Sequence, residues 1–529
     1  ANHNQGREFW GCMEREASKR CNYFKWADHD APRAKKDLQL LWQRMADVSH
    51  KAFTVVGPKG FRPEHILQGS VGDCWFLAAL AVVAERGGEL LSRNVLTRTP
   101  SLHGHYQFRL FIDGQWKVLS VDDHLPVRSQ ETCLPNAKKR DLPGMPALAF
   151  SKAADYQLWV PLLEKAYAKA HGCYKAISGG WIAEGLWDLT GFPTESIWFG
   201  ARHFDSEATW ARLLSFRDQG FLLGAICPAS GEGLVGSHAY SVLDVREMAG
   251  HTVGEQKHIR DFFNASENAR KGGPVALGAS RELPAGVTAE GTLRLVKIRN
   301  PWGQQEWTGA FSAGSEQWTP KLRAVLGQSD KDDGTFWMSW HDALSRFVGL
   351  DVCKTHKGWY AASIENLRFL PSTWIPSQCV QIRILEPTWM YATICQPTKR
   401  GKARRRYYYS DISMLVVRTS LAVDSNDGPE VLSVESLRLS GECRLSHSEM
   451  LLDDPTCVYL LIPISLGRAA SIRNHARPSQ GGSSQKQSAR GANFRDSAPF
   501  SIRLQCAKPV RYRPAPPSEC SLLRALHLA

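Results

Sequence analysis

The stretch "QGSVGDCWFLAAL", residues 68–80, places one cysteine between a Gly-Asp turn and an apolar run. A thiolate is a strong nucleophile, and a cysteine in the first turn of a helix has its pKa lowered by unpaired backbone N–H groups and the helix dipole. We therefore predict that Cys74 begins a helix and attacks a carbonyl carbon. The alternative is a packed core residue, since most cysteines that begin an apolar helix have no other role.

A thiol nucleophile needs a base, and the base needs an orienting group. His238 begins the alternating run "HAYSVLDV" after a glycine-rich turn, and Asn300 ends the run "LRLVKIRN". We expect His238 to be the base and the Asn300 amide to accept from its Nδ1–H, which would fix the tautomer. The alternatives are a hydrogen-bonded structural histidine and a turn residue before proline.

Two further side chains complete this prediction. Gln68 lies six residues before Cys74, and its amide N–H can stabilise an oxyanion together with the Cys74 backbone N–H. Trp302 follows a proline, and its indole can exclude water from the catalytic pair. Taken alone, Gln68 is equally well explained as an exposed loop residue. The joint occurrence of the four groups, in the order Gln, Cys, His and Asn, favours a cysteine hydrolase.

Regular elements must position these residues. The apolar run 75–84 predicts a buried helix that Gly87 and Gly88 end. Within residues 106–127, an Asp-Gly pair between alternating runs predicts a hairpin, and residues 158–172 predict a second helix that begins near Pro161. Strands are expected at the runs that carry His238 and Asn300. The polar stretch between them, about 246–290, is expected to be a surface insertion.

Length and composition limit the class of protein. A chain of 529 residues suggests roughly three domains. The longest apolar run is too short for a bilayer span, and from the polar N-terminus we expect no signal peptide. Because the sequence begins with Ala, we expect a fragment or a processed product. Thirteen scattered cysteines, an odd number, favour a reducing intracellular compartment over a secreted disulfide framework.

Long stretches of the sequence resemble the calpain family of cysteine proteases. They include "QGSVGDCWFLAALAVVAE", "LLEKAYAKAHGCYKAISGG", "HAYSVLDV", "IRNPWGQQEWTGAFS" and "DDGTFWMSWHDAL". The resemblance implies an α+β fold with a two-lobed, papain-like protease core, the Cys lobe at 53–201 and the His/Asn lobe at 202–356. It implies that Cys74 is the nucleophile and His238 the base and acid. Asn300 would orient His238, Gln68 would donate to the oxyanion, and Trp302 would shield the pair.

The resemblance also raises the question of calcium, because calcium-activated calpains bind one ion in each lobe through carboxylates. In the first lobe the expected acidic positions align with His65 and Gln157, so both charges are lost. In the second lobe Glu306 and Asp333 remain, while two other acidic positions align with Ala313 and Thr335. Ca²⁺ needs several oxygen ligands. We therefore expect at most a weak calcium site at Glu306 and Asp333. No EF-hand loop is present.

Residues 1–30 resemble a GRF-type zinc finger through Gly6-Arg7-Glu8-Phe9, and residues 31–52 read as a charged linker. Cys12 and Cys21 match the last two zinc ligands. A structural Zn²⁺ needs four ligands, so we expect the finger to be truncated, with two ligands upstream and only His3 as a local substitute. The alternative is two cysteines in an aromatic-rich loop. An intact finger would contact single-stranded nucleic acid or a protein partner.

From residue 357 short β-type runs predominate. They predict an antiparallel, C2-like β-sandwich at 357–511, with a disordered Ser/Gly/Gln-rich insertion at 467–498 and a tail at 512–529. The basic segment Lys399–Arg406 is expected to be a solvated loop. Contact with anionic lipid, contact with nucleic acid and a nuclear address are the alternatives. The C-terminal runs, the protease motifs and the finger together resemble most closely the small-optic-lobes type of calpain.

We therefore predict an intracellular, calpain-like cysteine endopeptidase that performs limited proteolysis on protein substrates. It would be cytoplasmic, with nuclear presence as an alternative. The competing hypothesis is a scaffold whose protease fold is inactive or only conditionally assembled, recruited through its zinc-finger and β-sandwich modules. The filled set of catalytic positions argues against the scaffold. The missing calcium ligands leave the activating signal open.

Overall fold

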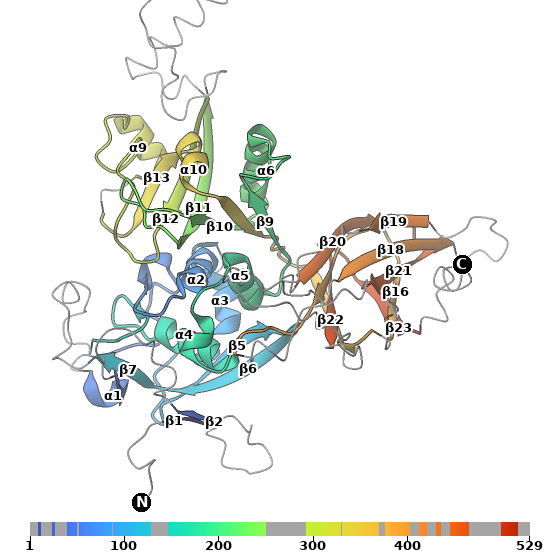
Figure 1. The fold of residues 1–529 in the computed structure, drawn as a ribbon, viewed down its shortest axis with the longest axis horizontal. Coiled ribbons are helices and arrows are strands. Elements are labelled where there is room, and N and C mark those ends of the chain that lie inside the picture. The colour runs from blue at the N-terminus through green and yellow to red at the C-terminus, as the bar shows by residue number, and fades with distance from the viewer. Residues whose placement is uncertain are drawn as a thin grey trace, which may run out of the picture. The chain divides into compact units, whose positions relative to one another are not determined.

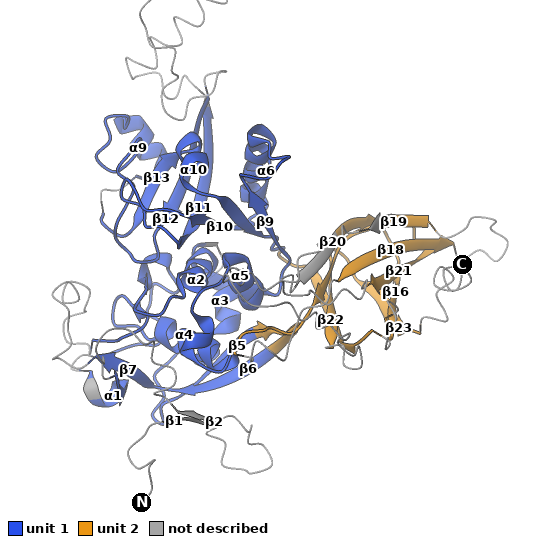
Figure 2. Cartoon of the chain, viewed as in Figure 1, with its two compact units in different colours: residues 1–110, 117–356 blue, residues 111–116, 357–529 orange. Residues whose placement is uncertain are grey.

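The computed structural model describes most of residues 40–369 and parts of the C-terminal region. The described residues are 9–11, 24–26, 40–49, 52–86, 88–128, 147–249, 292–328, 331–369, 376–401, 412–420, 430–434, 445–464 and 499–516. They form two compact units (Figure 2). The first comprises residues 1–110 and 117–356, and the second comprises residues 111–116 and 357–529.

The helix that begins at Cys74 lies at the centre of the first unit (Figure 1). This helix, α2 (Cys74–Arg86), is apolar on all faces, so it is stable only where protein surrounds it. Its residues from Trp75 to Ala84 are all buried. Phe76 stacks on Tyr167 of α4 (Trp159–Ala170), with ring centroids 4.0 Å apart. The predicted helix is therefore confirmed, and α4 begins two residues before the proline at which it was expected.

The elements that contact these two helices are α3 (Gly88–Asn94), η3 (Pro63–His65), β4 (Ile66–Leu67), β8 (Lys152–Ala153), η6 (Tyr174–Ile177) and α5 (Ile182–Thr190). The predicted hairpin forms strands β5 (His105–Ile112) and β6 (Gln115–Asp122), and its residues 111–116 belong to the second unit. The hairpin turn falls at Asp113-Gly114 as predicted, and both residues have positive φ angles, 59° and 82°.

Part of the segment expected to be a linker is regular structure. Residues 40–44 form β3 (Leu40–Arg44), which pairs antiparallel with β7 (His124–Arg128), and α1 (Met45–Val48) follows directly. Arg44 fixes this pairing because its Nε lies 3.0 Å from Oδ1 of the buried Asp123. The prediction missed the strand because the charged residues that precede it dominate the local composition.

A six-stranded sheet carries the second half of this unit. Its order is β13-β12-β11-β10-β14-β9, and each neighbouring pair is antiparallel. The members are β9 (Thr194–Trp198), β10 (Leu222–Cys227), β11 (His238–Ala249), β12 (Thr292–Arg299), β13 (Thr335–Ser339) and β14 (Gly349–Cys353), with α6 (Ser206–Asp218), α9 (Pro320–Leu326) and α10 (Trp340–Arg346) beside them. Strand β11 continues through residues 246–249, where the insertion was expected to begin; residues 250–291 lie outside the described residues.

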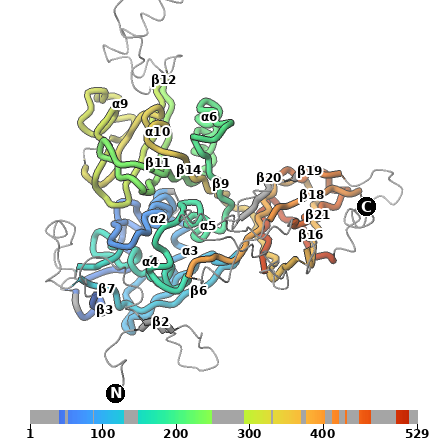
Figure 3. Tube along the Cα trace, in the orientation of Figure 1, coloured from blue at the N-terminus to red at the C-terminus, as the bar shows by residue number. Residues whose placement is uncertain are grey.

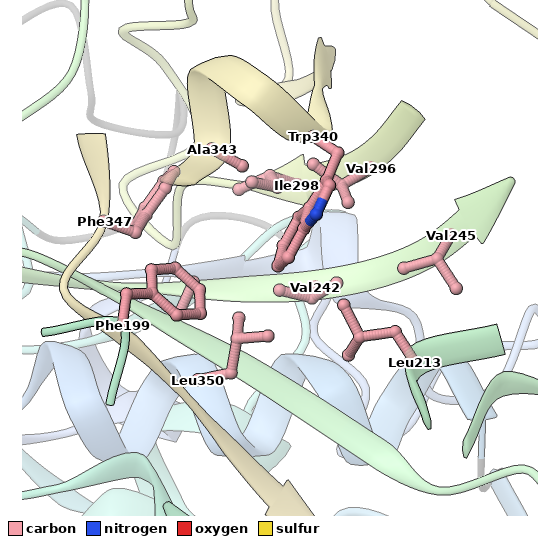
Figure 4. Close-up of a pocket in the computed structure, with 11 residues that line it drawn as sticks. Phe199, Leu213, Val242, Val245, Val296, Ile298, Trp340, Ala343, Phe347 and Leu350 are labelled. Carbon is pink, nitrogen blue, oxygen red and sulfur yellow. The ribbon is translucent and has the colours of Figure 1, made fainter. Parts of the chain in front are cut away.

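The core of this sheet is closely packed. A small cavity of about 10 Å³ lies in this core. Apolar side chains such as Val242, Ile298 and Trp340 line it (Figure 4). A space of that size with no polar partner does not hold a water. This cavity is therefore part of the core and not a ligand site, and the sheet is a rigid support for the residues at its strand ends.

The second unit consists of two antiparallel sheets. One has the order β15-β22-β17-β20 and the other β19-β18-β21-β16-β23. Their strands are β15 (Tyr360–Leu367), β16 (Cys379–Ile384), β17 (Thr388–Cys395), β18 (Ser413–Ser420), β19 (Glu430–Val434), β20 (Leu445–Leu452), β21 (Cys457–Ile464), β22 (Phe500–Cys506) and β23 (Val510–Ala515). Residues of both sheets share one hydrophobic cluster, for example Met390 of β17 and Leu461 of β21.

The Cα trace in Figure 3 follows these elements in chain order. Strand β23 crosses the boundary at which the tail was expected to begin. Most of the predicted finger at 1–30, the predicted insertion at 467–498 and residues 402–406 of the basic segment lie outside the described residues. Within residues 1–30, the short strands β1 (Phe9–Gly11) and β2 (Phe24–Trp26) pair antiparallel. Among the described helices, none is long and apolar enough to cross a bilayer.

Candidate active site

Cys74 occupies the position that its local sequence predicts. The backbone carbonyl of Asp73 accepts from the N–H of Phe76 at 2.9 Å, so Cys74 lies in the first turn of α2. Trp75 is buried, and its indole N–H donates to the Ile177 carbonyl at 3.0 Å. The tryptophan therefore fixes the rotation of the helix start and leaves the cysteine at the edge of the core.

The Cys74 thiol differs from the other described cysteines, since it is the one that is not buried. Burial of its surroundings nevertheless raises the pKa of the thiol, although the backbone N–H groups of Ala239, Trp75 and Cys74 itself oppose this shift. The expected lowering of the pKa is therefore wrong for the free site, because desolvation outweighs the helix terminus. A protonated thiol depends on a base to become a nucleophile.

His238 is the candidate base, and it lies at the start of β11, where Ala239 faces the sulfur. Its Nε2 is 2.9 Å from Oδ1 of Asn300, which follows the end of the neighbouring strand β12. The Asn300 amide is held from both sides. Its Nδ2 donates to the Gln304 carbonyl at 2.8 Å, and its Oδ1 also accepts from the Trp302 N–H at 3.0 Å. Its oxygen therefore faces the imidazole.

This arrangement decides the tautomer of His238. Because Asn300 Oδ1 can only accept, Nε2 must carry the proton, and Nδ1 keeps the lone pair. The prediction that Nδ1–H faces Asn300 is therefore wrong. Nε2 is the ring atom farther from the backbone, and it is the one that reaches across to the next strand. Both residues are buried, with 4% of His238 and none of Asn300 exposed.

Burial also sets the charge of the imidazole. Desolvation lowers the pKa of His238 to about 4, although the hydrogen bond to Asn300 raises it. The ring is therefore neutral at neutral pH and can accept a proton. Ser237, directly before it, has a φ angle of 52°, a region that non-glycine residues rarely adopt. Such strain is often found where a fold fixes a functional side chain.

Trp302 and Gln68 are also brought to this place. The indole ring of Trp302 lies 4.8 Å from the His238 ring, centroid to centroid. Its Nε1–H donates to Oε1 of Gln68 at 2.9 Å, and Gln68 Nε2 donates to the Val71 carbonyl at 3.0 Å. The indole can only donate, so the amide orientation of Gln68 is defined. Gln68 Nε2 carries two hydrogens, and the one that does not point to the Val71 carbonyl can donate to an oxyanion.

A carboxyl pair beside the nucleophile was not predicted. Asp73 and Glu164 of α4 are both fully buried, and burial, followed by the charge of Glu164, raises the pKa of Asp73 well above its ordinary value. Burial raises the pKa of Glu164 to about 7, and the Ser151 N–H donates to it at 3.1 Å. The signal in the sequence is a glutamate on the otherwise apolar face of a helix. From the sequence alone, Asp73 is expected only as part of the Gly-Asp turn before the helix.

The structure offers little support for a metal. Among the described residues, no three His, Cys, Asp or Glu side chains gather so that they could hold an ion. Glu306 Oε1 accepts from the Gly334 N–H at 3.0 Å, and Asp333 Oδ1 accepts from the Thr335 N–H at 3.0 Å. Burial, followed by the charges of Asp333 and its neighbour, raises the pKa of Glu306 to about 6. The zinc candidates Cys12 and Cys21 lie outside the described residues.

The gathered groups fit one type of chemistry. A thiol, a neutral imidazole with its amide partner, and amide donors beside the thiol are what nucleophilic acyl transfer requires. The set comes from α2, the start of β11 and the loop after β12, which lie far apart in the sequence. The fold is therefore what makes it a site.

Comparisons with known proteins agree with this chemistry. A sequence profile of calpain family cysteine proteases matches residues 23–354, and a profile of the GRF zinc finger matches residues 1–30. The calpain-type cysteine protease ADL1 of Oryza sativa is 33% identical over 341 residues, which cover 61% of this chain and 13% of that protein. The calpain-1 catalytic subunit of Bos taurus is 31% identical over 332 residues, which cover 61% of this chain and 39% of that protein.

Calpain-5 of Mus musculus is 29% identical over 363 residues, with 61% of this chain and 49% of that protein covered. In each case the chain spans less than half of the relative's length. The similarity therefore concerns the protease region.

Proposed function

Because the chain belongs to the calpain family of cysteine proteases, we propose that it is an endopeptidase whose catalytic residues are Cys74, His238 and Asn300. The observation that carries this proposal is the 2.9 Å contact between His238 Nε2 and Asn300 Oδ1, at a ring that is neutral. Because Nε2 of His238 donates to Asn300, Nδ1 of His238 is the ring atom that can act as the base. The Ala239 N–H that faces the Cys74 sulfur adjoins this ring.

The proposed reaction has two halves. His238 Nδ1 takes the thiol proton as the sulfur attacks the peptide carbonyl, and the oxyanion accepts hydrogen bonds from the Cys74 N–H and Gln68 Nε2–H. The imidazolium then gives its proton to the leaving amine, and an acyl-enzyme remains. His238 next deprotonates a water, which releases the acyl group and restores the thiol. Asn300 accepts from Nε2–H throughout, and Trp302 keeps bulk water from the ring.

The pH dependence follows from the charge of His238. We expect kcat/KM for a peptide to hold steady as the pH falls from neutrality and to be halved near pH 4, where His238 becomes protonated. A histidine with an ordinary pKa would halve kcat/KM at about pH 6.5, and that result would contradict the assignment of His238 as a neutral base. Since the unfolded chain binds more protons between these values, stability falls as the pH falls through the same window. Circular dichroism at each pH identifies the folded range.

For the protease core we propose a two-lobed, papain-like layout, with the substrate bound in extended form between the lobes. The remaining parts are proposed as accessory modules. The C-terminal one is proposed to be a C2-like β-sandwich, which is supported by the two sheets that share one core. The finger at 1–30 is proposed to recruit a protein or single-stranded nucleic acid, and Lys399–Arg406 to contact anionic lipid. A cytoplasmic location is proposed, with nuclear presence as the alternative, because thirteen scattered cysteines, an odd number, do not resemble a secreted disulfide framework.

One experiment separates the protease from an inactive scaffold. Cleavage of casein and of a fluorogenic peptide is measured with calcium and with EGTA, using the Cys74→Ser protein as the control. The proposal expects cleavage by the wild type and none by the variant. Equal cleavage by both, or none by either in calcium or in EGTA, would favour the scaffold.

A further inference from the structure

Two neutral residues meet at the position where the family's first calcium site is expected. His65, at the end of η3, and Gln157, just before α4, are each 2% exposed. Gln157 Nε2 lies 3.1 Å from His65 Nδ1, although the residues are 92 positions apart. Because an amide nitrogen only donates, Nδ1 is the acceptor and His65 is neutral. Burial lowers the pKa of His65, which agrees with that state.

Oxygen atoms around this pair already accept hydrogen bonds from the protein. Gln157 Oε1 accepts from the Gly57 N–H at 2.8 Å. The His65 carbonyl accepts from the Ala154 N–H at 2.9 Å, and the Ile66 carbonyl accepts from the buried guanidinium of Arg299 at 3.2 Å.

The charges of two carboxylates, Glu64 and Asp155, act on His65, and the described ion-pair contact is with Asp155. Asp155 Oδ2 lies 3.6 Å from His65 Nε2, and its side chain is 60% exposed. Calcium takes six to eight oxygen ligands, several of them carboxylates. A neutral imidazole, an engaged amide oxygen and a nearby guanidinium do not provide them. The residues present therefore do not fit a calcium ion at this place.

The pair joins two segments that lie far apart in the sequence. It links residues 57–65 directly to the loop before α4, and β4 continues from His65 by pairing with β8. The next residue after β4 is Gln68, whose backbone N–H donates to the Pro301 carbonyl at 3.3 Å. A rigid connection therefore runs from the pair to the oxyanion donor within three residues.

We propose that the His65–Gln157 hydrogen bond replaces the calcium ion in the half of the protease that carries Cys74, and holds Gln68 in place without metal. His65 and Gln157 are thus positioning residues. This inference rests on the proposed function, because it concerns the regulation of the same site.

The test compares the wild type with His65→Ala, Gln157→Ala and the double variant His65→Asp/Gln157→Glu. Peptide kcat/KM, thermal unfolding and calcium binding by calorimetry are measured in EGTA and in about 1 mM CaCl₂. Gln219→Ala is the matched control, since its amide makes one hydrogen bond to Ser215 in an exposed position.

In EGTA we expect each alanine variant to lose about tenfold in kcat/KM and to unfold at a lower temperature, with no rescue by calcium. The control should stay within about twofold of the wild type. The double variant should lose activity in EGTA, regain it in calcium and bind one more calcium ion than the wild type, because two carboxylates now face each other.

Two results would overturn the inference. One is a wild-type calcium site whose binding heat disappears in Gln157→Ala. The other is unchanged activity and unfolding temperature in both alanine variants. If the wild type proves inactive under every condition, the proposed function fails, but calcium binding and unfolding still decide whether the pair replaces the metal.

Discussion

Replacing Cys74 with alanine is expected to lower kcat/KM for a peptide substrate by about 10⁴-fold or more. The substitution removes the sulfur that forms the acyl-enzyme, and no described side chain beside it offers another nucleophile. The buried helix α2 loses one half-buried atom, so the fold should persist. Steady-state cleavage of a fluorogenic peptide, with circular dichroism to confirm folding, measures the effect.

The control for this variant is Cys353→Ala. Cys353 is a buried thiol on β14, 3.3 Å from the hydroxyl of Thr190, and has no part in the proposed chemistry. Its removal should cost stability and leave most of the activity of the folded protein. Cleavage by the Cys74→Ala protein at the wild-type rate would show that the nucleophile lies elsewhere.

Replacing His238 with alanine is expected to have an effect nearly as large, about 10³-fold or more on kcat/KM. The reason lies in the thiol, since burial raises the pKa of Cys74 and the sulfur stays protonated without a base. The same variant should react slowly with iodoacetamide at neutral pH and speed up only above the ordinary cysteine range. The rate of Cys74 alkylation as a function of pH measures this.

His105→Ala serves as the control for the histidine variant, because His105 is exposed at the start of β5. It should keep the wild-type cleavage and alkylation rates. An alkylation profile that is identical in His238→Ala and in the wild type would show that the imidazole does not act on the thiol.

The sequence was sufficient for those parts of the site that depend on local pattern. The Gly-Asp turn before an apolar run predicts the helix start at Cys74, and alternating runs predict the strands that carry His238 and precede Asn300. The strand β3 was not predicted, because it has only five residues and follows a charged segment. Its partner β7 lies about 80 residues away in the sequence, so local pattern does not indicate the pairing.

The electrostatics of the site could not be predicted in the same way. The raised pKa values of Cys74, Asp73 and Glu164 and the choice of Nε2 as the His238 donor all depend on burial by distant segments. The His65–Gln157 bond likewise joins residues that sequence reasoning had identified only as missing charges. Such facts belong to tertiary packing, which local pattern does not encode.

The most direct test of the central claim is the location of a covalent label. The protein is treated with a peptidyl epoxide at neutral pH, and the modified residue and the stoichiometry are determined by mass spectrometry. We expect one label per chain, on Cys74, that forms in the wild type and is absent from His238→Ala. Labels spread over several cysteines, or a Cys74 label that forms equally fast without His238, would contradict it.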